Sequence, residues 1–155
     1  MCKISIGYYS NYYNKERKMV LMITTYMANK IQNYIFRGES FTPPTTYYIA
    51  LSKTAPNVDG TGVTEPTNSE YERISVAKNT SNFSASVNGL VRNSVALLSV
   101  DTISDWGTIS HYGVYDSATG GNLLFFGELS NSRHIDVDMQ LVINVGGLVF
   151  ELTNA

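Results

Sequence analysis

The side chains singled out as candidates for acid–base chemistry are His111, His134, Asp105, Asp116, Asp136 and Asp138. Such a group acts in catalysis only when a third group holds it in place. His111 falls on one face of a predicted strand with Ile109 and Gly113, where a hydrogen-bonded structural histidine is the commoner case. Ser110 should point to the opposite face, because successive strand residues alternate. We therefore expect no catalytic residue.

Two further features have a structural and a functional interpretation. Asp136 and Asp138 share a face of a predicted strand and could form a carboxylate pair. Charges on a late strand more often protect an exposed sheet edge from unwanted pairing. Trp106 could stack on a sugar ring, but closing the end of a β-sandwich core is the favoured interpretation.

Metal and cofactor sites have little support in the sequence. Two histidines and one cysteine give no cluster with zinc spacing. Asn57, Asp59 and Thr61 in NVDGTG place oxygens at alternate positions, as a calcium loop does, but no glutamate closes the loop, so a glycine-rich turn is favoured. ATGGN lacks the lysine and the following helix of a phosphate site. We expect neither metal nor cofactor.

The elements that position these residues centre on the stretch from Asp105 to Leu129, DWGTISHYGVYDSATGGNLLFFGEL, which predicts a β-hairpin. Alternation divides its first strand between two faces, with Ile109, His111, Gly113 and Tyr115 on one and Tyr112 and Val114 on the other. The unbroken apolar run 123–126 is typical of a strand covered on both sides. In the SATGG turn, Gly120 and Gly121 can adopt the positive φ that hairpin loops require.

One helix is predicted, from Thr24 or Thr25 to Phe36. Its apolar face carries Ile23, Met27, Ile31 and Ile35 at a spacing of four, with Tyr34 beside them. Thr25 is the predicted N-cap, and Arg37 lies in the last turn, where a cation suits the helix dipole. Gly38 is placed to end the helix in a left-handed conformation.

The rest of the chain is predicted to form short strands separated by loops. Beside the hairpin, strands are predicted at Thr46–Ser52, Tyr71–Ala77, Asn82–Val87, Asn93–Val100, Arg133–Val137 and Leu141–Leu152, the last interrupted at Gly146 and Gly147. No helices alternate with these strands. The fold class is therefore mainly β: an antiparallel, jelly-roll-like β-sandwich of about eight short strands with one N-terminal helix.

The length and amino-acid composition argue against several classes of function. The 155 residues, 43% of them hydrophobic, suffice for one domain with a core of its own. A formal charge of −2 leaves no basic surface for nucleic acid. No apolar run approaches the roughly 20 residues that span a bilayer, and the basic start lacks a cleavage site, so neither membrane insertion nor a signal peptide is expected.

The first residues differ from the rest. Met1 to Lys18 is polar and has no clear period, which predicts a mobile arm. Its tyrosines, Tyr8, Tyr9, Tyr12 and Tyr13, are candidate docking residues for a neighbouring subunit, with packing on the chain's own sheet as the alternative. The predicted division is a docking arm over residues 1–26 and a β-sandwich domain over 27–155.

Three stretches together resemble a family of small bacteriophage structural proteins, the tail fibre and related virion proteins. They are MANKIQNYIFRGESFTPPTTYYIALSKTAPN, SEYERISV after a glycine-rich loop, and the hairpin. The resemblance covers roughly Met27 to Leu152. It carries over no catalytic residue, only architectural positions: Trp106, Gly107, Gly113, Tyr115, Asp116, Gly120, Gly121, Leu124, Phe125 and Gly127.

The resemblance implies a non-enzymatic β-rich component of the virion, made in the host cytoplasm. It implies a homo-oligomer, with a trimer the expected state, that binds other phage virion proteins. The favoured interpretation is a tail fibre or a component attached to the tail or baseplate, and the alternative is a capsid decoration or head-fibre protein. A second alternative is a carbohydrate-binding module for host surface glycans, in which Trp106 would be a stacking platform. A small hydrolase would need a buried acid–base pair that the sequence does not indicate.

Overall fold

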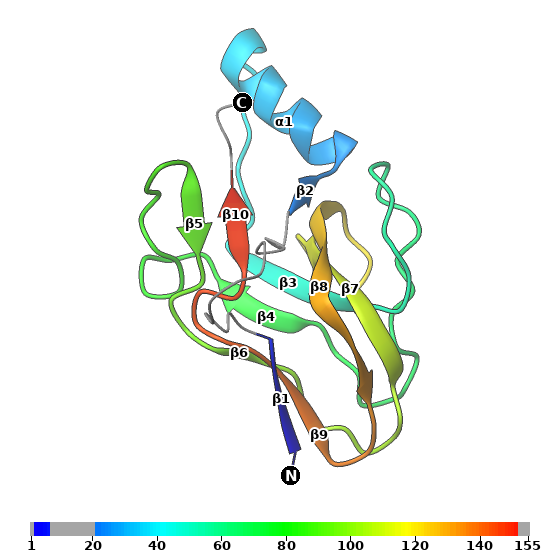
Figure 1. Ribbon diagram of the computed structural model, residues 1–155. Helices are drawn as coiled ribbons and strands as arrows, with labels where there is room; N and C mark the ends of the chain where they lie inside the picture. The colour runs from blue at the N-terminus through cyan, green and yellow to red at the C-terminus, as the bar shows by residue number, and fades with distance from the viewer. Residues whose placement is uncertain (1, 7–20, 152–155) are drawn as a thin grey trace, which may run out of the picture.

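The computed structural model describes residues 2–6 and 21–151, which form ten strands and one helix (Figure 1). The strands before the hairpin are β1 (Cys2–Ile6), β2 (Met22–Ile23), β3 (Thr46–Ser52), β4 (Ile74–Ala77), β5 (Leu90–Arg92) and β6 (Leu97–Leu98). The helix α1 (Thr25–Arg37) lies between β2 and β3. The later strands are β7 (Gly107–Tyr115), β8 (Leu123–Ile135), β9 (Met139–Ile143) and β10 (Val149–Glu151). No helix within the described residues has the length and apolar character needed to cross a membrane.

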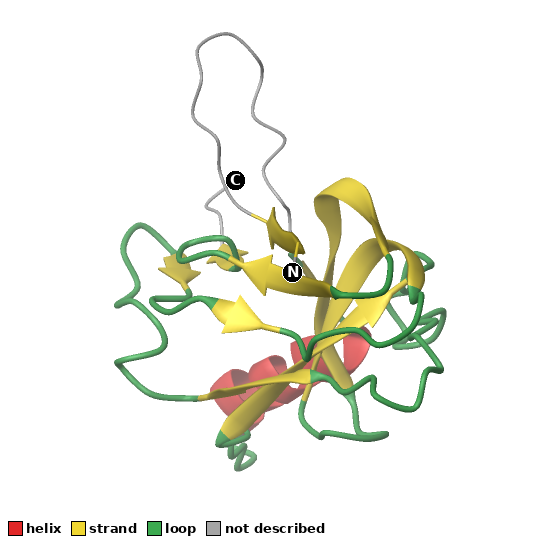
Figure 2. Ribbon diagram, turned by 90° about the horizontal axis from the view of Figure 1, so that it is seen from below, coloured by secondary structure: helices red, strands yellow, loops and turns green. Residues whose placement is uncertain are grey.

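These strands form three sheets. The largest has the order β2-β8-β7-β3-β4 with antiparallel pairs throughout. A second has the order β1-β9-β6, and β10 pairs with β5 in a third. In Figure 2, α1 lies behind the strands, at the end of the sheets away from the viewer. The predicted mainly β, antiparallel sandwich with an N-terminal helix is confirmed, apart from the parallel pairing of β1 with β9.

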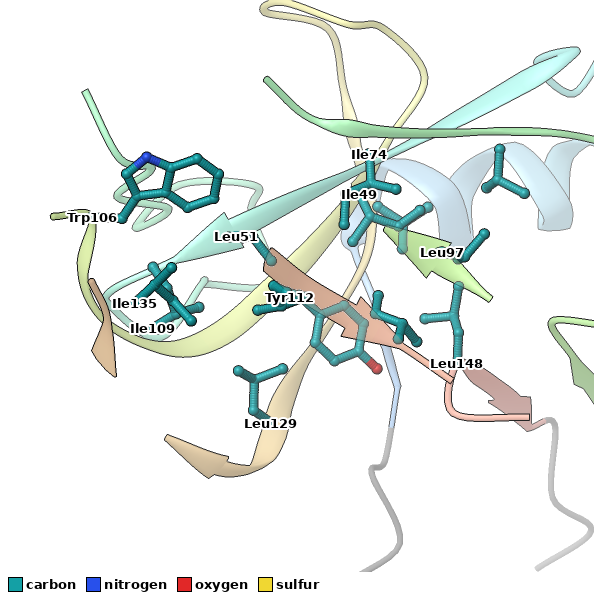
Figure 3. Close-up of a cluster of buried hydrophobic side chains, with 14 residues drawn as sticks. Ile49, Leu51, Ile74, Leu97, Trp106, Ile109, Tyr112, Leu129, Ile135 and Leu148 are labelled. Carbon is teal, nitrogen blue, oxygen red and sulfur yellow. The ribbon is translucent and has the colours of Figure 1, made fainter. Parts of the chain in front are cut away.

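The core lies between the two larger sheets. Its fully buried side chains come from β3, β7 and β8 on one side and from β9 and the 144–148 turn on the other (Figure 3). Trp106 and Ile135 close one end of this cluster, and Ile49 and Leu97 lie toward the other. Burial of this apolar surface is the main term that stabilises a domain of this size without a disulfide.

The predicted hairpin is present. β7 and β8 are antiparallel neighbours, and the connecting turn places Gly120 at φ +58 and Gly121 at φ +75. Three of the four side chains in the run 123–126 are buried, and Phe125 is half-buried. Within β8 the strand continues to Ile135, so residues 133–135 belong to the hairpin and do not form a strand of their own.

The two faces of β7 differ from the predicted alternation. Ile109 and Tyr112 were assigned to opposite faces, yet both lie in the same core cluster (Figure 3). The register of β7 against β8 shifts between Ile109 and His111, where Ser110 of β7 lies opposite the longer stretch 129–132 of β8. Beyond this shift, Tyr115 packs in a second cluster with Ala50, Leu123 and Phe126.

Two other predicted strands are wrong in their bounds. Residues 82–87 make only isolated bridges, at Phe83 and Val87, because the chain turns at Asn88 (φ +52) and Gly89 (φ +76). The strand β5 lies instead just after this turn, and of residues 93–100 only Leu97–Leu98 forms a strand, while Asn93 makes the isolated bridge to Phe83. Thr46–Ser52 agrees with its prediction, and the turn at 146–147 separates β9 from β10 as expected.

The first strand lies inside the segment that was predicted to be a mobile arm. Cys2–Ile6 pairs in parallel with Met139–Ile143, so a mobile arm is the wrong description of these five residues, and for them the chain's own sheet is the partner. The four candidate docking tyrosines lie outside the described residues.

The N-cap of the helix lies one residue before the predicted one. Thr24 is the N-cap, with extended backbone (φ −75, ψ 158), and Thr25 is the first helical residue. The Thr24 Oγ1 accepts a hydrogen bond from Met27 N (3.3 Å) and donates to Leu123 O (2.7 Å) on β8. Gly38 ends the helix at φ +69, as predicted. One buried hydroxyl therefore both starts the helix and fastens it to the large sheet.

Replacing Thr24 with valine is expected to lower the free energy of unfolding by about 1–2 kcal/mol, since the helix loses its cap and a buried carbonyl loses a donor. The emission of Trp106, the one tryptophan of the chain, reports urea unfolding. Thr24→Ser is the matched control and should retain most of the stability. Equal midpoints for Thr24→Val and the native chain would contradict this role.

Candidate functional site

Two of the acid–base candidates meet at the surface. His134 Nε2 lies 3.3 Å from Asp105 Oδ1, and both side chains are 54% exposed. Asp105 Oδ1 also accepts a hydrogen bond from Gly107 N (2.6 Å), which fixes the carboxylate at the start of β7. An exposed pair of this kind contributes little to stability. It lies on the flank of the hairpin, where it joins the far ends of β7 and β8.

The second histidine contacts the serine that was expected to point away from it. Ser110 Oγ is 2.8 Å from His111 Nδ1, next to the register shift that follows Ile109. The same hydroxyl lies 3.1 Å from Lys53 O, which can only accept. The single hydroxyl proton therefore points to the carbonyl, and His111 donates from Nδ1 to Ser110. This polarity is the reverse of the one in which histidine activates a serine nucleophile.

The other carboxylates occupy turns. Asp136 and Asp138 were assigned to one strand face, but they lie in the turn between β8 and β9, where Asp138 has φ +59. Asp136 Oδ1 accepts from Val137 N (2.8 Å), and Thr102 Oγ1 donates to Asp136 O (2.6 Å). These bonds shape the turn, and the proposed carboxylate pair on a strand is wrong.

The NVDGTG segment is held by its own hydrogen bonds. Thr61 N and Thr61 Oγ1 both donate to Asp59 Oδ1, and Asn57 N donates to Thr61 O (2.8 Å). These bonds from Thr61 hold the pKa of Asp59 below its usual value. Across residues 21–151, His, Cys, Asp and Glu form no group of three suited to a metal ion.

Trp106 closes one end of the core, which is the interpretation that the sequence favoured. Its side chain is 0% exposed, so it cannot be a stacking platform for a sugar. Its indole Nε1 donates to Glu70 Oε1 (3.0 Å), and its ring meets Tyr71 edge-on at 5.2 Å. Ser104 Oγ donates to the same carboxylate oxygen (2.6 Å), and this bond is the first cause of the lowered pKa of Glu70.

The turn of the hairpin is closed by one carboxylate. Asp116 accepts hydrogen bonds from Asn122 N (2.7 Å) and Asn122 Nδ2 (2.8 Å), so the residues before and after the glycines are joined directly. Asp116 therefore shapes the turn, and the two glycines provide the backbone angles. The remaining architectural positions lie on the same hairpin: Gly107, Gly113 and Tyr115 on β7, and Leu124, Phe125 and Gly127 on β8.

A buried arginine holds this turn to the large sheet, and sequence reasoning missed it. Arg73, whose side chain is 7% exposed, forms an ion pair with Glu65 (2.7 Å). Its Nη1 donates to Ser117 O and Gly120 O, each at 2.8 Å, and its guanidinium lies 3.7 Å over the Tyr115 ring. The stretch SEYERISV does not indicate that this arginine is buried, because the two carbonyls to which it donates lie 44 and 47 residues away.

Glu65 continues the same network toward the core. It accepts from the Tyr71 hydroxyl (2.8 Å), which in turn accepts from Leu51 N (2.9 Å) at the end of β3. Burial is the first cause that raises the pKa of Tyr71. These bonds therefore join the loop before β4 and the turn of the hairpin to the sheet.

The end of α1 exposes three consecutive large apolar side chains. The predicted apolar face is buried only at Met27, whereas Tyr34, Ile35 and Phe36 are 59%, 61% and 81% exposed. The helix packs on β8 at its start and projects from one end of the sandwich (Figure 1). Contiguous exposed apolar side chains commonly mark a contact with another protein.

Comparison with known proteins identifies the family. A search of curated proteins gave no match. The family model described as podophage GP4 fiber I protein gp80 matches residues 22–151, which include α1, the large sheet and the whole hairpin. This chain belongs to the podophage GP4 fiber I protein family.

Proposed function

We propose that this chain is a non-enzymatic subunit of a fibre on the phage particle, attached at the tail or baseplate and built from contacts between identical copies. The observation that carries the proposal is the family match over residues 22–151. The geometry supports it, because the acid–base candidates hold turns and strands together. Immunogold labelling of intact particles with an antibody to this chain should mark the tail. Label on the head would favour the alternative of capsid decoration.

The contact between copies uses the exposed end of α1 in this proposal. Tyr34 and Ile35 continue the face that begins at buried Met27, so the apolar stripe runs past the point where the chain's own sheet covers it. A second copy that covers this stripe would remove the exposed apolar surface from water. The apolar stripe is independent of the tyrosines at positions 8–13, which are a second set of proposed docking residues.

Sedimentation at tens of micromolar tests the contact. The native chain should be an oligomer, with three copies as the expected number, and Ile35→Lys should weaken association at least tenfold. Lysine near the helix C-terminus suits the dipole, so the helix itself should persist. Gln32→Lys, at an exposed polar position on the same helix, is the matched control and should associate normally. A native chain that is monomeric without a partner would count against the proposal.

A further inference from the structure

The exposed end of α1 carries basic as well as apolar side chains. Lys30, Tyr34 and Arg37 are spaced four and three residues apart, so they follow one face of the helix, and all three are exposed. No residue of α1 is acidic. Arg37 pairs with Glu39 just after the helix, but both side chains are at least 50% exposed, and such a pair contributes little to stability. Arg37 can therefore exchange this partner for another carboxylate.

A second exposed apolar surface lies where the 101–105 loop meets the turn from β8 to β9. Thr102 joins the two segments, because its Oγ1 donates to Asp136 O (2.6 Å) and its carbonyl accepts from Asp138 N (2.9 Å). Ile103, 71% exposed, and Val137, 48% exposed, therefore lie close together. Figure 1 shows this turn at the foot of the sandwich and α1 at its top.

Carboxylates surround this apolar pair. The exposed ones in the two segments are Asp101, Asp105, Asp136 and Asp138. Two basic residues, Arg133 and His134, precede the turn on β8, and His134 lies 3.3 Å from Asp105. The other three aspartates form no ion pair within the described residues. We call the four aspartates, Ile103 and Val137 the acidic end, and its charge is opposite to that of the α1 face.

We propose that the end of α1 in one copy docks on the acidic end of the next copy. Tyr34 and Ile35 pack on the apolar pair, while Lys30 and Arg37 face the carboxylates around it. Opposite charges around an apolar centre give such a contact its orientation. The contact joins two different surfaces, so the three copies proposed above close into a ring. This inference rests on the contact between copies proposed above and names the surface that receives the helix.

A contact between two α1 ends is the less favourable arrangement. It would bring Lys30 and Arg37 of one copy toward the same residues of the other, and like charges across an interface disfavour association. It would also be a self-complementary contact, which closes at two copies. The acidic end meets neither objection.

Two variants, each with one damaged surface, test the docking. Ile103→Lys damages the acidic end and Ile35→Lys damages the helix end, and each chain alone should associate at least tenfold more weakly than the native chain. A mixture of the two retains one intact helix end and one intact acidic end, so it should associate again and stop at two copies. Sedimentation at tens of micromolar measures both. Val87→Lys, at an apolar position that is 64% exposed and outside both surfaces, is the matched control and should associate normally.

Ile103 is mostly exposed, so its replacement should leave the fold intact, and thermal unfolding followed by Trp106 emission checks this. If Ile103→Lys unfolds, Val137→Lys takes its place in the same mixture. Native association of the folded variant, or a mixture that stays monomeric, would overturn the docking and leave the proposed function standing. A native chain that is itself monomeric would instead overturn the contact between copies on which the docking rests.

Salt separates the charged rim from the apolar centre. The Debye length falls from about 10 Å at about 0.1 M salt to about 3 Å at about 1 M, which screens exposed charges. Association of the native chain should therefore weaken at least threefold over this range of sodium chloride. Association that stays equal or becomes stronger would overturn the pairing of the basic face with the acidic end.

Discussion

Replacing Arg73 with methionine is expected to lower the free energy of unfolding by about 3 kcal/mol, the largest effect that we predict for this chain. The substitution keeps much of the side-chain volume but leaves Glu65, 24% exposed, without its cation. Removing one partner of a buried ion pair typically costs about 3–5 kcal/mol, and the partial exposure of Glu65 places the expected value at the lower end. Urea unfolding followed by Trp106 emission measures the loss.

A double variant separates the ion pair from the rest of the network. Arg73→Met combined with Glu65→Gln removes both charges, so it should recover a large part of the lost stability. The part that is not recovered belongs to the bonds from Arg73 to Ser117 O and Gly120 O and to its contact with Tyr115. A single Arg73→Met variant within 0.5 kcal/mol of the native chain, the usual range for surface changes, would show that Arg73 does not anchor the turn.

The features that sequence predicted well are local. The SATGG turn carries its own backbone angles in Gly120 and Gly121, and the helix carries its end signal in Gly38. Thr46–Ser52 was delimited correctly because the prolines before it and the polar loop after it are both close in sequence. Each of these signals acts within a few residues, so the residue types suffice.

The features that sequence missed depend on contacts between distant residues. The register of β7 against β8 shifts after Ile109, Tyr112 lies in the same core cluster as Ile109, and Ser110 contacts His111. Simple alternation along β7 cannot show this shift, because the extra residues belong to the partner strand. The Arg73 network likewise joins the loop before β4 to the hairpin turn, and no local pattern indicates that pairing.

The helix shows where sequence pattern and structure give different information. A stripe from Met27 to Ile35 predicts an apolar face, and the face exists, but only Met27 is buried by the chain's own sheet. Periodicity indicates that a face should be covered and says nothing of which molecule covers it. The exposed remainder is therefore the part of the pattern that supports assembly.

Glycine at position 127 makes room for a tyrosine on the neighbouring strand. Gly127 lies directly opposite Tyr112, and an added Cβ would lie 2.8 Å from the Tyr112 hydroxyl and 3.0 Å from its Cζ. Tyr112 is 1% exposed and packed in the core, so its ring cannot move aside easily. Gly127→Ala is therefore expected to lower the free energy of unfolding by about 2 kcal/mol, as overpacked cores do.

Gly113→Ala is the matched control, because Gly113 lies on the other strand of the same hairpin. Its added Cβ would lie 2.6 Å from Leu123 Cδ1, the tip of a side chain that can change rotamer, and 3.2 Å from Tyr115 Cε2, farther than the 3.0 Å to Tyr112 Cζ at Gly127, so we expect a smaller loss than for Gly127→Ala. Equal losses would show that the Tyr112 ring is not what makes glycine necessary at position 127. Urea unfolding of the two variants side by side makes the comparison.

The Tyr112 hydroxyl provides an internal check on this mechanism. It is buried and has no hydrogen-bond partner among the described residues, a state that costs about 1–3 kcal/mol, and its burial raises the pKa of Tyr112. Tyr112→Phe should therefore be at least as stable as the native chain. Because the hydroxyl is also the atom nearest the added methyl group, Tyr112→Phe should reduce the loss caused by Gly127→Ala by about 1 kcal/mol in a double-mutant cycle. Strict additivity of the two changes would mean that the methyl group and the hydroxyl do not meet.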